Sequence, residues 1–176
     1  MTPVGSALVA LVMDEYTLDA DGIHGPGHWA RVRVNGLALA ERTPDADAEL
    51  VELFALLHDA ARRDDGRDIG HGERAAALVR RSVADDLLLL CEARASVLAE
   101  ACAGHEHGGV SSDPTIGCCW DADRLDLSRL GRRPIATLLS TQAAMDPALQ
   151  AAAWERGGSL FVPPVHLQSV RDGFPA

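Results

Sequence analysis

The stretch "FALLHDAARRDDGRDIGHGERAA", residues 54–76, joins an apolar, helix-like run to a polar segment rich in glycine. His58 and Asp59 stand at the junction, and His71 precedes a second helix-like run. A buried carboxylate is costly unless a cation or hydrogen-bond donors compensate its charge. Imidazole and carboxylate together suit transition metals, manganese and magnesium. The pair therefore indicates a metal site at the inner end of a helix.

The composition predicts an ordinary globular protein. The 176 residues are 47% hydrophobic and 24% charged, which is enough for one packed core, and we expect a single domain over residues 1–176. The net charge of −10 disfavours long nucleic acids and anionic membranes as partners. All 16 basic residues are arginines, which excludes Schiff-base chemistry by lysine.

The N-terminal apolar run and the cysteines indicate a cytoplasmic protein. Residues 4–13, "VGSALVALVM", are too few to span a bilayer and lack the positive flank of a signal peptide. Cys91, Cys102, Cys118 and Cys119 are then expected to be free thiols, with Cys91 and Cys102 in the core.

Hydrophobic periodicity and capping residues predict an all-α fold, because strand signals are nearly absent. We expect helices over residues 3–19, 27–42, 44–63, 72–82, 85–104, 120–131 and 146–158. Thr43 would cap the third helix, with Pro44 in its first position. Residues 106–119 are predicted to form a long irregular loop, and the prolines of residues 161–176 predict an irregular tail.

Histidines gather at predicted helix ends and in polar loops. Apart from His58, these are His24, His28, His71, His105 and His107, and the acidic run "DADRLD", residues 121–126, follows them. Together they form a set of nitrogen and oxygen donors for divalent metals.

The order of these motifs resembles the HD superfamily of metal-dependent phosphohydrolases, which is named for its His-Asp pair. The resemblance rests on "HWARV" (28–32), "LLHDAAR" (56–62), "HGERAA" (71–76), "CAGHEHGG" (102–109) and "DADRLDL" (121–127), within residues 23–131. It implies an all-helical, HD-type bundle that binds one or two divalent ions, chosen among Mn, Fe, Co, Ni, Zn and Mg.

The resemblance also implies a ligand set. A first ion would be held by His28, His58, Asp59 and Asp123, and His71 and His105 match the extra histidines of members with two ions, in which the Asp of the pair bridges. His107 would instead face the substrate or be solvated. We expect Asp121 to be a cap, Asp126 a surface or Arg-paired carboxylate, and His24 a loop hydrogen-bonder or a substrate contact. Trp29 and Trp120 would pack in the core or wall the pocket, and the tail residue His166 would be structural or exposed.

The function implied is hydrolysis of a small phosphorylated metabolite, most plausibly a nucleotide or cyclic nucleotide, by metal-activated hydroxide attack on phosphorus. Arg31, Arg62 and Arg124 could bind phosphate, although salt bridges to Asp64, Asp65 or Asp68 are the alternative for Arg31 and Arg62. By the same resemblance, Asp64 or Asp65 could orient the attacking water or bind the leaving group. The alternatives are a diiron HD-type oxygenase and a non-catalytic metal or nucleotide sensor. Apolar helix faces would also allow a homo-oligomer.

Overall fold

The computed structural model describes residues 5–158, and within that range its regular elements are all helical, which confirms the all-α prediction. The elements are α1 (Ser6–Glu15), α2 (Pro26–Ala40), α3 (Ala48–Leu57), α4 (His71–Ala84), α5 (Glu92–Gly104), η1 (His105–His107), α6 (Pro114–Leu125), η2 (Asp126–Leu130), η3 (Ala136–Leu138), η4 (Ala143–Met145) and α7 (Pro147–Gly158). No helix in the described range is long and apolar enough to cross a membrane. His166 and the predicted tail lie outside it.

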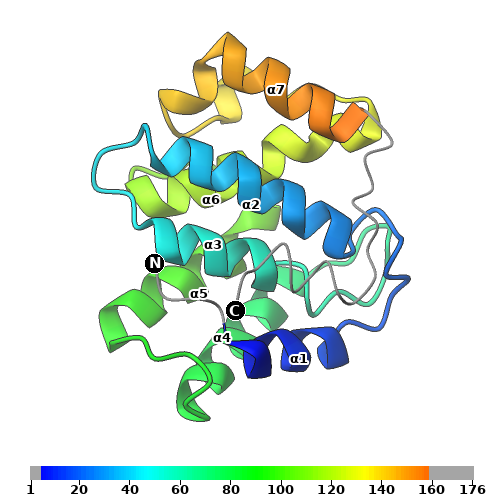
Figure 1. Cartoon of the computed structure of the whole chain (residues 1–176), viewed down its shortest axis with the longest axis vertical. Coiled ribbons are helices and arrows are strands. Elements are labelled where there is room, and N and C mark those ends of the chain that lie inside the picture. Colours follow the sequence, from blue (N-terminus) through cyan, green and yellow to red (C-terminus); the bar gives the residue numbers. More distant parts are fainter. Residues whose placement is uncertain (1–4, 159–176) are drawn as a thin grey trace.

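Helix α3 forms the centre of the bundle (Figure 1). Its residues 50–57 are all buried, as expected for a helix that is apolar on most of its circumference. The predicted span 44–63 is too long at both ends. Asp47 caps α3 by accepting hydrogen bonds from the backbone N–H groups of Glu49 and Leu50, whereas the Thr43 hydroxyl donates to the Leu39 carbonyl at the end of α2.

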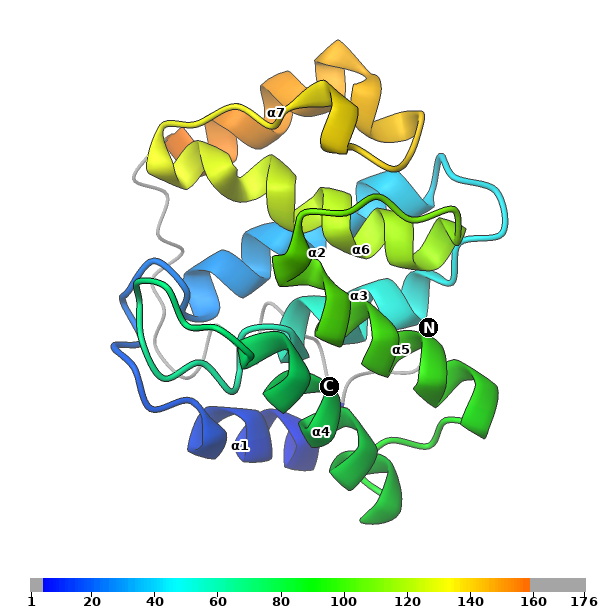
Figure 2. The same cartoon turned by 180° about the vertical axis from the view of Figure 1, so that it is seen from behind.

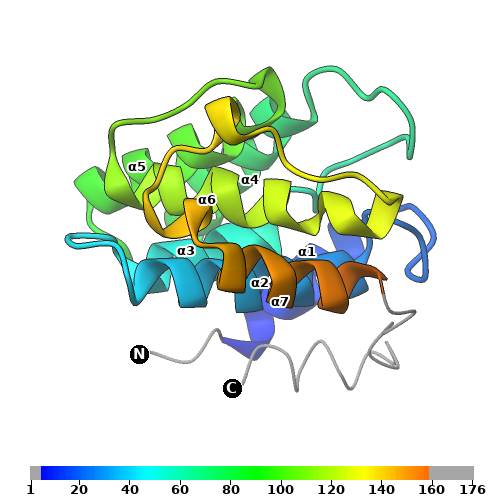
Figure 3. The same cartoon turned by 90° about the horizontal axis from the view of Figure 1, so that it is seen from above.

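The other helices enclose α3 from two sides. Helix α2 packs along α3, while α4 and α5 pack on each other across the bundle from α2 (Figure 3). The view from behind brings α4, α5 and α6 to the front (Figure 2). Gly36 allows the close approach of α2 to α3, since a Cβ atom there would lie 2.5 Å from Val51 Cγ1. Helix α6 contacts α2, α3 and α5, and α7 covers η2 and part of α2.

The predicted helix over residues 85–104 begins later than expected, at Glu92. Residues 85–91 are not helical, because α4 ends in a turn where the Leu87 and Leu88 N–H groups both bind the Ser82 carbonyl and Asp86 has φ 56°. Cys91 is consequently exposed at the start of α5, not part of the core, although all four cysteines are free. Helix α1 is shorter than the predicted 3–19, whereas α2 and α7 lie close to their predicted spans.

Helix α6 begins well before the predicted residue 120. The Asp113 carboxylate accepts hydrogen bonds from the Thr115 and Ile116 N–H groups, and Pro114 occupies the first helical position. The predicted loop 106–119 therefore contains only a short irregular stretch after η1. Cys118 and Cys119 lie buried within α6.

Candidate metal centre

The six predicted ligands converge from five parts of the chain. His28 lies in the first turn of α2, His58 and Asp59 directly follow α3, and His71 is the first residue of α4. His105 follows α5, and Asp123 lies in the last turn of α6. The four histidines and Asp59 are buried, while the Asp123 side chain is 24% exposed and marks the side open to solvent.

One group of ligand atoms surrounds Oδ2 of Asp59. His28 Nε2 lies 3.5 Å from Asp59 Oδ2, 3.1 Å from His58 Nε2 and 3.3 Å from Asp123 Oδ1. His58 Nε2 lies 3.7 Å from the same Asp59 oxygen. We call His28, His58, Asp59 Oδ2 and Asp123 the first half of the centre.

A second group surrounds Oδ1 of Asp59. His71 Nε2 lies 3.4 Å and His105 Nε2 3.6 Å from that oxygen, and the two nitrogens are 2.9 Å apart. We call His71, His105 and Asp59 Oδ1 the second half. The ligand atoms of His28, His58 and Asp59, and likewise those of Asp59, His71 and His105, are close enough together to hold a metal ion. A different Asp59 oxygen lies nearest each pair of histidines. Asp123 joins the first half through its 3.3 Å approach to His28 Nε2. The geometry brings together all six predicted ligands.

The outer nitrogen of every ligand histidine faces an acceptor. His28 Nδ1 lies 2.7 Å from Asp126 Oδ2, and His58 Nδ1 lies 3.2 Å from the Phe54 carbonyl. His71 Nδ1 lies 2.7 Å from the Asp68 carbonyl, and His105 Nδ1 lies 2.6 Å from the Cys102 carbonyl. A neutral imidazole that donates through Nδ1 presents a lone pair at Nε2. All four Nε2 atoms therefore point lone pairs into the centre, the arrangement that metal-binding histidines require.

The electrostatics of the cluster favour a cation. Burial alone would raise the pKa of Asp59, but His58, His105 and His28 hold that pKa well below its usual range. Burial lowers the pKa of His58 to about 3, and it lowers the pKa of His71 as well. Burial would also lower the pKa of His105, but its hydrogen bond to Asp59 raises that pKa. The ionised Asp59 carboxylate thus attracts positive charge, and a divalent ion among the converging ligand atoms would supply it.

A close contact between two helix ends brings the second half together. A Cβ atom at Gly72 would lie 2.6 Å from the Cys102 carbonyl oxygen, so glycine lets the start of α4 meet the end of α5. Glu106 reinforces the contact by accepting hydrogen bonds from the Gly70 and Gly72 N–H groups. Its carboxylate also lies 3.4 Å from His71 Nδ1. Glu106 was not predicted as a site residue, because only the folded chain brings it to the start of α4.

The Arg62 guanidinium lies beside the second half. Its Nη1 donates toward Asp59 Oδ1 at 3.4 Å and His71 Nε2 at 3.1 Å. Nη2 donates to the Gly66 carbonyl at 2.9 Å, and Nε donates to the Asp64 carbonyl at 3.3 Å. The alternative of salt bridges to the side chains of Asp64, Asp65 or Asp68 is wrong for Arg62, whose carboxylate partner is Asp59.

Arg31 lies behind His28 and pairs with Asp126. Its Nε and Nη2 donate to the two carboxylate oxygens at 2.7 and 3.0 Å. Asp126 is fully buried, so the expected Arg pairing is confirmed and a surface position is wrong. Burial would raise the pKa of Asp126, but His28 and Arg31 lower it. Arg31 therefore pairs with Asp126 and not with Asp64, Asp65 or Asp68, and the pair fixes the His28 ring. The contact of Arg31 with a substrate phosphate stays a prediction.

The remaining predicted site residues lie away from the ligand atoms. Arg124 donates to the carbonyls of Leu138 and Gly109 and so joins two loops. His107 is exposed at the end of η1, and Asp64 is an exposed loop residue whose carboxylate accepts from the Gly66 N–H. Asp121 is no helix cap: it is fully buried and accepts from the Ser140 and Thr141 N–H groups.

The two tryptophans near the ligands pack in the core, and His24 binds a loop residue. Trp29 is fully buried in the core, and Trp120 donates through Nε1 to the Ala101 carbonyl, so the core-packing interpretation is confirmed for both. His24 is buried, and its Nδ1 lies 3.0 Å from Asp65 Oδ1. This pair joins the loop before α2 to the loop after α3.

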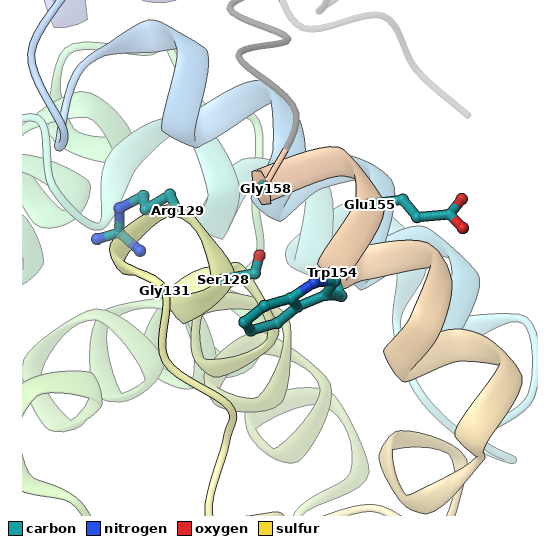
Figure 4. A pocket seen from close by; sticks show the side chains of 7 residues that line it. Ser128, Arg129, Gly131, Trp154, Glu155 and Gly158 are labelled. Carbon is teal, nitrogen blue, oxygen red and sulfur yellow. The ribbon is translucent and has the colours of Figure 1, made fainter.

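An open pocket of about 660 Å3 lies elsewhere, between η2 and α7 (Figure 4). The Trp154 ring faces the turn that carries Ser128 and Gly131, while Arg129 extends to the other side of that turn. None of the six candidate ligands lines this pocket. The metal centre is thus a buried cluster distinct from the pocket.

The comparisons with known proteins identify no relative. No protein-family model, curated protein or solved structure matches the chain. Any functional conclusion therefore rests on the residues of the centre and on the motifs that carry them.

Proposed function

We propose that the protein is a metal-dependent phosphohydrolase of the HD type that acts on a small phosphorylated metabolite. The observation that carries the proposal is the convergence of four histidine Nε2 atoms on the two carboxylate oxygens of Asp59, with the Asp123 carboxylate 3.3 Å from His28 Nε2. The sequence order of these ligands, within an all-helical chain, also supports membership of the HD superfamily.

The first half supplies the more complete set of ligands. It offers two imidazoles and two carboxylates, and Asp123 is the ligand that borders solvent. A divalent ion held there would supply a hydroxide nucleophile near neutral pH and offset charge on a phosphoryl group. His28 and His58 would orient that ion through rings that Asp126 and the Phe54 carbonyl fix from outside.

Arg62 would supply the positive charge next to the ion. Its guanidinium is the one among Arg31, Arg62 and Arg124 that lies against the ligand atoms, within 3.4 Å of Asp59. A guanidinium can bind two phosphoryl oxygens at once, so Arg62 is the candidate to orient the substrate phosphate. The net charge of −10 favours a small substrate over a nucleic acid polymer.

The test is metal analysis followed by turnover. We expect protein purified without added metal or a histidine tag to contain about one divalent ion per chain. With that ion restored it should hydrolyse p-nitrophenyl phosphate or bis(p-nitrophenyl) phosphate, and Asp59→Ala should remove both the metal and the turnover. A fully active Asp59→Ala protein that keeps its metal would refute the proposal.

The bridging position of Asp59 supports a diiron oxygenase as the second candidate, because each of its oxygens faces a separate pair of histidines. That function requires iron in both halves. Two irons per chain and no phosphoester turnover would favour the oxygenase, and its activity would be lost without oxygen.

A further inference from the structure

The second half of the centre already contains a positive group. Arg62 Nη1 lies 3.1 Å from His71 Nε2 and 3.4 Å from Asp59 Oδ1, two of the three atoms that would ligate a second ion. The third atom, His105 Nε2, is 2.9 Å from His71 Nε2. A guanidinium nitrogen therefore lies where a second ion would have to meet its ligands.

The loop after α3 holds the guanidinium in this position. Besides Asp59 and His71, Arg62 donates to the Gly66 carbonyl at 2.9 Å and to the Asp64 carbonyl at 3.3 Å. Arg62 itself is only 7% exposed. A buried side chain with four acceptors does not leave its place without losing those hydrogen bonds, and a divalent ion would have to displace it.

His71 Nε2 can bind either the Arg62 guanidinium or a metal ion. Because His71 Nδ1 faces the Asp68 carbonyl at 2.7 Å, Nε2 presents a lone pair that a guanidinium N–H or a metal ion can accept. Two positive groups cannot share that lone pair and the single oxygen Asp59 Oδ1, since like charges a few ångströms apart repel.

Within residues 5–158, we find no arginine hydrogen bond to the His28 or His58 Nε2 atoms of the first half. Two arginines lie nearby, but both are held by Asp126: Arg31 donates to its two carboxylate oxygens on the outer side of His28, and Arg129 Nη1 lies 3.6 Å from its Oδ2. The His28 and His58 Nε2 atoms face each other at 3.1 Å, with Asp123 as a second carboxylate. The two halves therefore differ in whether a protein cation competes for their ligands.

We propose that Arg62 competes with the second metal ion, so that the centre binds one ion tightly in the first half and a second only weakly. This inference rests on the proposed metal centre and adds the regulation of its loading. Displacement of Arg62, for instance by a substrate phosphate that draws the guanidinium away, would open the second half to an ion.

The test is Mn2+ titration of chelator-treated protein by isothermal calorimetry, with no substrate present. In Arg62→Gln the second Mn2+ should bind at least about tenfold more tightly than in the unmodified protein, while the first binds as before. Arg63→Gln is the matched control, since it removes the same charge from the exposed neighbouring residue and should behave like the unmodified protein.

Electron paramagnetic resonance of the unmodified protein gives a second readout that depends on no variant. At one equivalent of Mn2+ we expect the signal of isolated ions, with spin-coupled pairs only at a large excess. Coupled pairs at low loading would overturn the inference, as would unchanged or weaker second-ion binding in Arg62→Gln. No Mn2+ binding by either half in any of these proteins would instead refute the metal centre itself, and the inference with it.

Discussion

The two halves of the centre share Asp59 but differ in how the fold builds them. The first half is set by the first turn of α2, the end of α3 and the last turn of α6, and it includes Asp123 beside solvent. The second half lies where the start of α4 meets the end of α5, with Arg62 against its ligands. The two halves therefore offer similar ligand types but different local charge, because a guanidinium lies against the ligands of the second half only.

The largest effect is expected from Asp59→Asn, which affects both halves at once. An amide cannot supply the negative charge that two ions share, so metal content should fall to near zero and hydrolysis should be lost. Elemental analysis of the purified variant measures this. Asp14→Asn, at an exposed residue of α1, is the charge-matched control and should retain metal. Metal content equal in both variants would remove Asp59 from the centre.

The second largest effect is expected from variants that each remove one ligand histidine from a single half. His58→Gln is expected to remove the tightly bound ion and turnover, since it deletes one of the two imidazoles of the first half. His105→Gln should keep that ion and lose only the weaker second one. Calorimetric titration with Mn2+ compares the two variants. If both lose the tight ion equally, the division into halves is wrong.

A smaller effect should follow from the outer carboxylates. Asp126→Asn weakens the acceptor that fixes His28 and should lower the affinity for the tight ion by about 10- to 100-fold. Glu106→Gln, which acts on the Gly70–Gly72 turn and on His71, should leave the tight ion unchanged and weaken only the second. The same titrations provide the measurement. Selective loss of the tight ion in Glu106→Gln would contradict this assignment.

The smallest effect is expected at Asp47, which caps α3, the helix that leads to His58 and Asp59. Asp47→Ala removes a helix cap and should lower the free energy of unfolding by about 1 kcal/mol without favouring either half. Burial would raise the pKa of Asp47, but Arg94 and the capped N–H groups lower it. The ionised carboxylate therefore stabilises the fold at pH values above about 3.8, and this contribution is lost as the pH falls through the lowered folded pKa. Denaturant unfolding at pH 7 and pH 3 should show the difference between the proteins shrinking at low pH.

Much of the centre could be predicted from local sequence. The His58-Asp59 pair ends an apolar run, and His71 follows a glycine-rich loop, so helix ends and candidate ligands were recognisable from composition and spacing. Helix boundaries were harder to predict, because more than one polar residue could cap each helix. Asp47 caps α3 in place of the predicted Thr43, and Asp113 caps α6 well before its predicted start at residue 120. The roles of the arginines were least predictable, since Arg31 and Arg62 each stand about one helical turn after a ligand histidine and yet bind different partners.

The helical class and the set of donor atoms could be predicted without a structure, because periodicity and residue chemistry are local properties of the chain. Which donors face one another depends on the packing of the folded chain. The pairing of Asp59 Oδ1 with one pair of histidines and Oδ2 with the other, the burial of Asp126 behind His28, and the position of Arg62 all depend on contacts between residues far apart in sequence or on the path of a loop. Such contacts follow from packing around α3, which no local pattern encodes.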